Sequence, residues 1–351
     1  MAGNIYDTTT LLEVLRVTKT PSRFWLQFFN RQINFDTEDV AFDKVFVDDR
    51  KLAPFVVPNV QGRVMGMEGY ETYSFKPAYV KPKHVVDPNM VIPRMAGETL
   101  GSGSMSPEQR RNAVIAELLR RHRVMHENRW EWMAAQAIIT GKVVVKGEDY
   151  PEVTVDFRRH ASLTGTLSGA AKWDQSTANP LNDLKIMRVN AHNRSGARVQ
   201  RHIFGADAWD MLTQRVNLKD MMDVNYRGGY GTNVSLMLDG LEGIEYVGTI
   251  VGSNGGGRLE CYVNTAKYID PDTGNEEFFL DQKTVVGVSE AVQGVRCFGA
   301  IKDRSAGYRP LPLFPKNWEN EDPSVEYLMT QGAPLMVPGQ PDATYSIKVA
   351  T

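Results

Sequence analysis

Apolar residues recur at helical spacing over a long stretch in the first half of the chain. Ser106 is a suitable N-cap, Pro107 fits the first helical turn, and Gln109 completes a capping box. Gly141 is a natural C-terminal stop. The apolar stripe consists of Ile115, Leu118, Met125, Trp132 and Ile139. The pattern predicts one helix over 106–140, about 50 Å long, which is expected to act as a spine.

Shorter periodic runs follow the predicted spine helix. Two β-type runs, 143–145 and 153–157, flank a turn and predict a hairpin. Helical patterns near 180–193 and 206–214 enclose a strand near 199–204. Further strands are expected at 244–251, 260–265, 277–281, 284–288 and 345–349, with a tight turn at 272–275. The alternation predicts a mixed α+β chain.

A cluster of large apolar residues lies near the N-terminus. Thr20 and Pro21 are suited to start a helix, and five of the six residues from Phe24 to Phe29 are large and apolar. Such an apolar segment is expected to be covered by other parts of a protein and not to remain in water. Two interpretations remain open: burial in the chain's own core, or an arm laid across a neighbouring subunit. The residues concerned are Phe24, Trp25, Phe28 and Phe29.

Prolines and glycines interrupt short β-type runs between residues 51 and 95. Because prolines in strands are confined to edges and ends, the region predicts a long two-stranded excursion that reaches another molecule. The residues that mark this excursion are Pro58, Gly62, Gly69, Tyr79, Lys81 and Lys83.

Composition narrows the function classes. The 351 residues include 40 basic and 42 acidic ones, which is not the basic excess of a dedicated nucleic-acid binder. Two cysteines form no disulfide framework and suit a reducing cytoplasm. No apolar run approaches the roughly 20 residues that a membrane span needs, so no membrane partner is expected.

Candidate chemistry is sparse. His122 and His126 have a metal-compatible spacing, but Arg123 stands where a zinc-protease motif needs glutamate, so a solvated or interface helix face is expected. Arg120, Arg121 and Arg123 could contact nucleic-acid phosphates or pair with carboxylates such as Glu117. No catalytic residue, cofactor or metal site is expected.

Three segments carry a resemblance to a known family. They are 79–84, 314–318 and 331–336, which combine long cations, Trp318 and several prolines. In this order and spacing they resemble the major capsid proteins of lambda-type tailed bacteriophages, although Gly332 stands where serine would be expected. Pro315, Lys316, Trp318 and Pro334 are expected to pack in a peripheral domain, with Trp318 in its core.

The resemblance implies the Hong Kong 97-type capsid fold. It divides the chain into an N-terminal arm (1–50), an extended loop (51–95), a peripheral domain (96–178) that contains the spine helix 106–140, an axial domain (179–303) and a return to the peripheral domain (304–351).

The resemblance also implies a function in assembly. Subunits would form hexamers and pentamers of an icosahedral head around double-stranded DNA, which they contact weakly and nonspecifically. A scaffold, a portal and a decoration (cement) protein are the implied partners, and assembly in the host bacterial cytoplasm would place the chain in the virion capsid. No isopeptide crosslink is expected at Lys76, Lys81 or Lys83. The alternatives are a cellular nanocompartment shell of the same fold and a cytoplasmic α/β enzyme.

Overall fold

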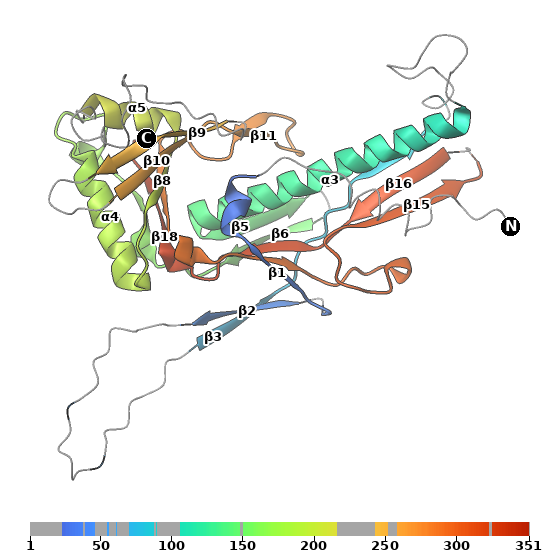
Figure 1. Ribbon diagram of the computed structural model, residues 1–351, viewed down its shortest axis with the longest axis horizontal. Coiled ribbons are helices and arrows are strands. Elements are labelled where there is room, and N and C mark those ends of the chain that lie inside the picture. The colour runs from blue at the N-terminus through green and yellow to red at the C-terminus, as the bar shows by residue number, and fades with distance from the viewer. Residues whose placement is uncertain are drawn as a thin grey trace, which may run out of the picture.

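The molecule is elongated, with a helical spine running through most of its length (Figure 1). The computed structural model describes residues 23–37, 39–45, 55, 61, 70–87, 89, 106–147, 150–215, 243–251, 258–322 and 325–350. A sheet lies at each end of the spine helix, and a two-stranded ribbon leaves the body between them (Figure 1). The mixed helix and strand architecture confirms the expected α+β class.

The spine helix α3 spans Pro107–Thr140. The Ser106 side chain accepts from the Gln109 amide, the reciprocal bond completes a capping box, and Gly141 ends the helix in the left-handed conformation. These ends confirm the predicted helix. The predicted apolar stripe is partly wrong, because Met125 is 45% exposed while His122 is buried.

A peripheral sheet packs on the first half of α3. Its strands are β15 (Phe314–Asn320), β16 (Val325–Gln331) and β4 (Lys83–Val86), in the order β15-β16-β4. Arg111 of α3 pairs with the nearly buried Glu326 of β16 at 2.7 Å. The apolar residues that join sheet and helix are Val86, Ile115, Leu118, Leu119 and Leu328.

The strand β4 corrects the predicted extent of the extended loop. Residues 83–86 pair with β16, and Val80 forms a bridge with Gly332. This part of the predicted loop 51–95 therefore belongs to the body of the molecule. The ribbon itself consists of β2 (Val40–Val45) and β3 (Tyr70–Phe75), which are antiparallel. It starts at residue 40, so the predicted boundary between arm and loop at residue 50 is wrong.

The axial sheet at the other end of α3 has six strands in the order β7-β18-β13-β8-β10-β9. One face is covered by α4 (Pro180–Ser195) and α5 (Ala206–Arg215), whose Leu184 and Leu212 pack with Phe204 and Tyr345 of the sheet. On the other face, Val286 and Val288 join the core around α3. The strands are β7 (Thr164–Thr166), β8 (Arg201–Phe204), β9 (Ile244–Val251), β10 (Arg258–Asn264), β13 (Thr284–Val288) and β18 (Thr344–Lys348).

Smaller elements connect the two ends. A three-stranded sheet has the order β1-β14-β17, built from Arg31–Asn34, Val295–Phe298 and Pro334–Val337. The predicted hairpin is confirmed as β5 (Lys142–Gly147) and β6 (Tyr150–Asp156). A second hairpin pairs β11 (Lys267–Ile269) with β12 (Glu276–Phe278), so the strand predicted over 277–281 ends earlier. Short 3-10 helices are Trp25–Phe28 (η1), Ala161–Leu163 (η2), Gly169–Ala171 (η3), Glu290–Val292 (η5), Arg304–Ala306 (η6) and Pro341–Ala343 (η7).

Candidate assembly surfaces

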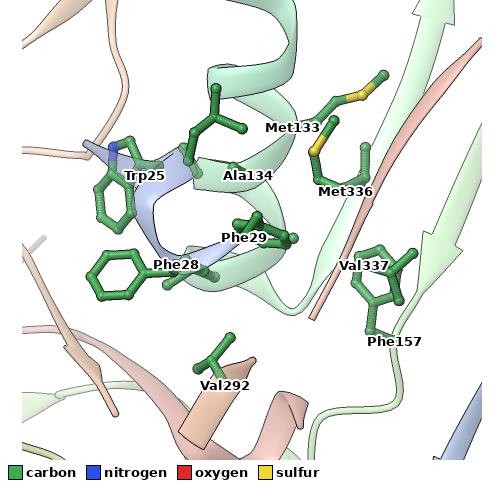
Figure 2. Close-up of a cluster of buried hydrophobic side chains, with 14 of the residues drawn as sticks. Trp25, Phe28, Phe29, Met133, Ala134, Phe157, Val292, Met336 and Val337 are labelled. Atoms are coloured by element: carbon green, nitrogen blue, oxygen red, sulfur yellow. The ribbon is translucent and has the colours of Figure 1, made fainter. Parts of the chain in front are cut away.

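The aromatic N-terminal segment lies in the chain's own core. Trp25 and Phe29 have no exposed surface, and Phe24 and Phe28 are 4% and 6% exposed. Figure 2 shows Trp25, Phe28 and Phe29 beside Ala134 of α3. Of the two interpretations, the structure supports burial in the chain's own core for these four residues, and it contradicts their assignment to an assembly arm on a neighbouring subunit. Residues 1–22 of the predicted arm lie outside the described residues.

Two charged side chains, the buried Glu131 and the half-buried Arg296, hold both ends of this segment. The Glu131 carboxylate accepts from the backbone N–H groups of Trp25 at 2.7 Å and Leu26 at 2.9 Å. From β14, Arg296 donates through Nε to the Phe29 carbonyl at 2.7 Å and through Nη2 to the Leu26 carbonyl at 3.0 Å. The bonds to the Trp25 and Leu26 amides and to the Phe29 carbonyl satisfy backbone groups that a single short turn leaves unpaired, while the Leu26 carbonyl also accepts from the Phe29 amide.

The environment of Glu131 shifts its titration. Burial raises the pKa of Glu131 to about 7, and the backbone N–H donors of Trp25 and Leu26 partly oppose that shift. Sequence reasoning missed both Glu131 and Arg296, since one glutamate on a helix and one arginine on a strand look like ordinary surface charges. Only the fold brings them to the same turn.

A glycine allows the segment to pack this closely. A Cβ atom at Gly294 would lie 2.5 Å from the Phe29 ring and 2.7 Å from the Phe28 carbonyl oxygen. The amide of Gly294 donates to that same oxygen at 2.9 Å. Any larger residue would push the segment off β14.

The two spine histidines are buried between helix and sheet. His122 Nε2 lies 2.6 Å from Nδ1 of His84, and His126 Nε2 lies 3.1 Å from the Thr330 hydroxyl. Burial lowers the pKa of His122 to about 4 and that of His126 to about 3. The expected solvated or interface face is therefore wrong for both. Among the described residues, no group of three or more His, Cys, Asp or Glu side chains could hold a metal ion.

The arginine cluster at 120–123 pairs with carboxylates of the same helix. Glu117 accepts from Arg120 at 2.8 Å and from Arg121 at 2.9 Å, while Arg123 lies 3.2 Å from Glu127. The hydrogen bonds from Arg120 and Arg121 lower the pKa of Glu117 to about 2. The predicted i,i+4 pairing of Glu117 with Arg121 is confirmed, and phosphate contact stays a prediction.

The outward face of the peripheral sheet carries an aromatic pair. Trp318 stacks on Tyr327 with ring centroids 5.4 Å apart, and Lys83 Nζ lies 3.9 Å from the Tyr327 centroid. Trp318 is only half-buried, so the expectation of a core position is wrong. Pro315 and Pro334 are buried, and Lys316 pairs with Asp303 at 2.8 Å.

Of the residues assigned to the extended loop, those after residue 77 belong to the body. The Tyr79 hydroxyl donates to the Ala300 carbonyl at 2.8 Å and accepts from the Lys302 amide at 3.2 Å. Lys81 Nζ lies 4.9 Å from the centroid of the Tyr79 ring. Pro58, Gly62 and Gly69 lie outside the described residues.

The two cysteines in the described part of the chain are poorly suited to react. Cys261 and Cys297 are free and buried, and burial raises the pKa of each thiol to about 12. Such thiols are poor nucleophiles at neutral pH. Within the described ranges, no helix combines the length and the apolar character that crossing a membrane requires.

The arrangement defines a class of protein. One spine helix, a peripheral sheet, an axial sheet with helices on one face and a projecting ribbon make up the Hong Kong 97-type capsid fold (Figure 1). A crystal structure of a prophage capsid protein from Escherichia coli CFT073 superposes with a TM-score of 0.73 at 25% identity, covering 98% of this chain and 99% of the other.

Sequence comparison gives the family. The profile described as phage major capsid protein E matches residues 7–349, and the chain belongs to that family. The major capsid protein of Escherichia phage lambda is 30% identical over 332 residues, which is 92% of each chain. That of Escherichia phage N15 is 30% identical over 357 residues, covering 99% of this chain and 100% of the relative. The chain is thus a major capsid protein of a phage head, which confirms the resemblance found in the sequence.

Proposed function

We propose that copies of this chain assemble through hexamers and pentamers into the icosahedral shell of a phage head. The observation that carries the proposal is the ribbon β2–β3, which leaves the body of the subunit (Figure 1). Phe55 supports it, since this large apolar side chain is fully exposed in the single chain.

The body and the ribbon have different roles in this assembly. The body keeps the N-terminal segment to itself, because Glu131 and Arg296 bind that segment's backbone to α3 and β14. The ribbon lies over the next subunit and supplies the contact that a thin subunit cannot make with itself. Permanent interfaces of this kind are large and close-packed. The function is therefore mechanical, and no residue is assigned a catalytic role.

Further partners follow from membership in a phage head. A scaffold would set the shell's curvature, a portal would occupy one vertex, and a decoration protein would reinforce the expanded shell. Packaged double-stranded DNA would make weak, nonspecific contact with the inner surface, where Arg120 and Arg121 are candidates. Assembly would take place in the host bacterial cytoplasm. The family match favours this head over a nanocompartment shell.

Negative-stain microscopy and sedimentation velocity of the expressed full-length chain test the proposal. Closed shells, or free hexamers and pentamers, are the expected result. A well-folded monomer or small oligomer at every protein concentration, with or without a scaffold protein co-expressed, would contradict it. Nuclease-protected double-stranded DNA in particles from phage-producing cells separates a head from a nanocompartment.

A further inference from the structure

Two exposed apolar pairs occur on elements next to the axial sheet (Figure 1). On α4, Ile186 and Val189 are each 48% exposed and lie one turn apart on the face away from the sheet. On the β11–β12 hairpin, Ile269 is 68% exposed and Phe278 is 42% exposed. Single exposed apolar residues are common, but paired ones on a regular element indicate a contact surface. We call them the α4 patch (Ile186, Val189) and the hairpin patch (Ile269, Phe278).

The hairpin patch is a preorganised surface. Lys267 pairs with Phe278 and Ile269 with Glu276 in the strand register, so Ile269 and Phe278 are diagonal neighbours on one face. Tyr268, which alternates to the other face, packs its ring 5.0 Å from that of Phe279 and donates to Glu277 at 2.7 Å. The hairpin therefore uses one face for its own packing and leaves the other outward.

The two patches have opposite electrostatic surroundings. The hairpin over 267–278 has one basic residue and four acidic ones, namely Lys267, Asp270, Asp272, Glu276 and Glu277. Helix α4 has three basic residues and one acidic one, and its exposed Lys185 and Arg194 flank the α4 patch. Two α4 patches facing each other would bring like charges together, whereas an α4 patch facing a hairpin patch brings opposite charges together.

The positions of the patches suit a ring. In Figure 1, α4 and β11 lie on different sides of the axial sheet. A contact between two different surfaces of the same chain is heterologous, and such contacts close into rings when the rotation allows it. Rings of five and six copies are the units that the proposed function requires, and this inference rests on that proposal.

We infer that the α4 patch of one copy docks on the hairpin patch of the next copy around the capsomer axis. Ile186 and Val189 pack against Ile269 and Phe278. Lys185 and Arg194 face the carboxylates of Asp272 and Glu276. Each copy uses both surfaces, one toward each neighbour, so the contact repeats until the ring closes.

Crosslinking of assembled shells tests the pairing. The V189C/I269C variant is treated with a short bismaleimide and separated under denaturing conditions. A ladder that ends at five and six chains is expected. Shells built from either single variant should yield only uncrosslinked chains under denaturing conditions. Shells that contain both single variants should yield crosslinked dimers and no larger species. The wild type is a control, because Cys261 and Cys297 are buried. V189C/V144C, with the second cysteine on the exposed Val144 of β5, is the matched control pair.

Charge reversal gives an independent readout. K185E/R194E and D272K/E276K should each reduce shell yield by about tenfold, since each places like charges in the contact. Combining all four substitutions should restore the yield, while circular dichroism shows each variant folded. All four positions are exposed or face solvent in the single chain.

The outcomes separate the two proposals. Shells that form without the intermolecular ladder, or that tolerate both charge reversals, would overturn the inference and leave the proposed function intact. A crosslink found only within single chains would also overturn it. A wild-type chain that never forms capsomers or shells would instead contradict the proposed function.

Discussion

Large apolar side chains have opposite environments in the N-terminal aromatic segment and at Phe55, which lies between β2 and β3 in the sequence. Trp25 and Phe29 are fully buried in the chain's own core, whereas Phe55, in the connection between β2 and β3, is fully exposed. The first segment has Glu131 and Arg296 to satisfy its backbone and Gly294 to admit its rings. Apolar composition thus indicates that a segment must be covered by other protein. Whether its own chain covers it depends on whether that chain also supplies polar side chains, such as Glu131 and Arg296, for the segment's backbone groups.

The largest expected effect comes from disrupting the packing of the buried N-terminal aromatic segment. Phe29→Asp places a carboxylate in a closed apolar site and should destabilise the subunit by at least about 4 kcal/mol. Urea unfolding of the variant, or its failure to accumulate in a folded form, measures the loss. Phe55→Asp is the matched control, and it should change the free energy of unfolding by less than about 0.5 kcal/mol while lowering shell yield. Equal stability of the two variants would contradict the comparison.

Acid should weaken the body of the subunit through its buried histidines. His126 is held neutral, with a pKa of about 3, whereas in the unfolded chain it takes up a proton near its ordinary value of 6.5. Stability is therefore lost as the pH falls below 6.5, by roughly 1.4 kcal/mol per pH unit for this group. Unfolding at pH 7, 6 and 5 should show a shallower loss in His126→Gln than in the wild type. An unchanged slope would place the imidazole in water.

Glu131→Gln sharpens the account of how the N-terminal segment is held. A carboxamide offers one acceptor oxygen where the carboxylate offers two, so one amide of Trp25 or Leu26 loses its hydrogen-bond partner, which costs about 2 kcal/mol before the relief of the buried charge is counted.

The pH dependence of the same variant gives a second test. Glu131 in the folded chain keeps its proton up to about pH 7, against 4.5 ordinarily, so its contribution to stability falls as the pH rises between these values. Glu131→Gln should lack that fall. Chemical unfolding of both proteins at pH 5 and pH 8 measures this pH dependence. If the wild type and Glu131→Gln showed the same change in the free energy of unfolding, the carboxylate would not be buried.

The smallest expected effect concerns the half-buried aromatic pair. Trp318→Ala removes one ring of a stack that is open on its outer side, so the loss should be about 1 kcal/mol and not the several of a core tryptophan. Differential scanning calorimetry would detect it as a lower Tm. Trp173→Ala, at a fully buried site, is the reference. Equal losses would place Trp318 in the core after all.

Local chemistry made the spine helix predictable from sequence. The capping box at Ser106 and the stop at Gly141 act within one turn of chain, so its limits needed no tertiary information. The hairpin at 142–156 and helices α4 and α5 were found for the same reason.

Long-range pairing limited the remaining predictions. β4 pairs with a strand more than 200 residues away, and His84 meets His122 only because that pairing exists. The aromatic segment was left between two alternatives because burial does not reveal which chain provides the cover. The contacts of Glu131 and Arg296 with the N-terminal segment join three distant parts of the sequence. None of the three parts contains a local sequence pattern that predicts these contacts.

Removing the connection between β2 and β3, residues 46–69, tests the central claim most directly. Val45 and Tyr70 are paired at the far ends of β2 and β3, so an Asn-Gly turn can join them and replace residues 46–69. Sedimentation velocity of this variant should show a folded subunit with wild-type circular dichroism that never forms shells. Normal shells from it would contradict the claim that the ribbon and the connection between its strands supply the contact with the next subunit.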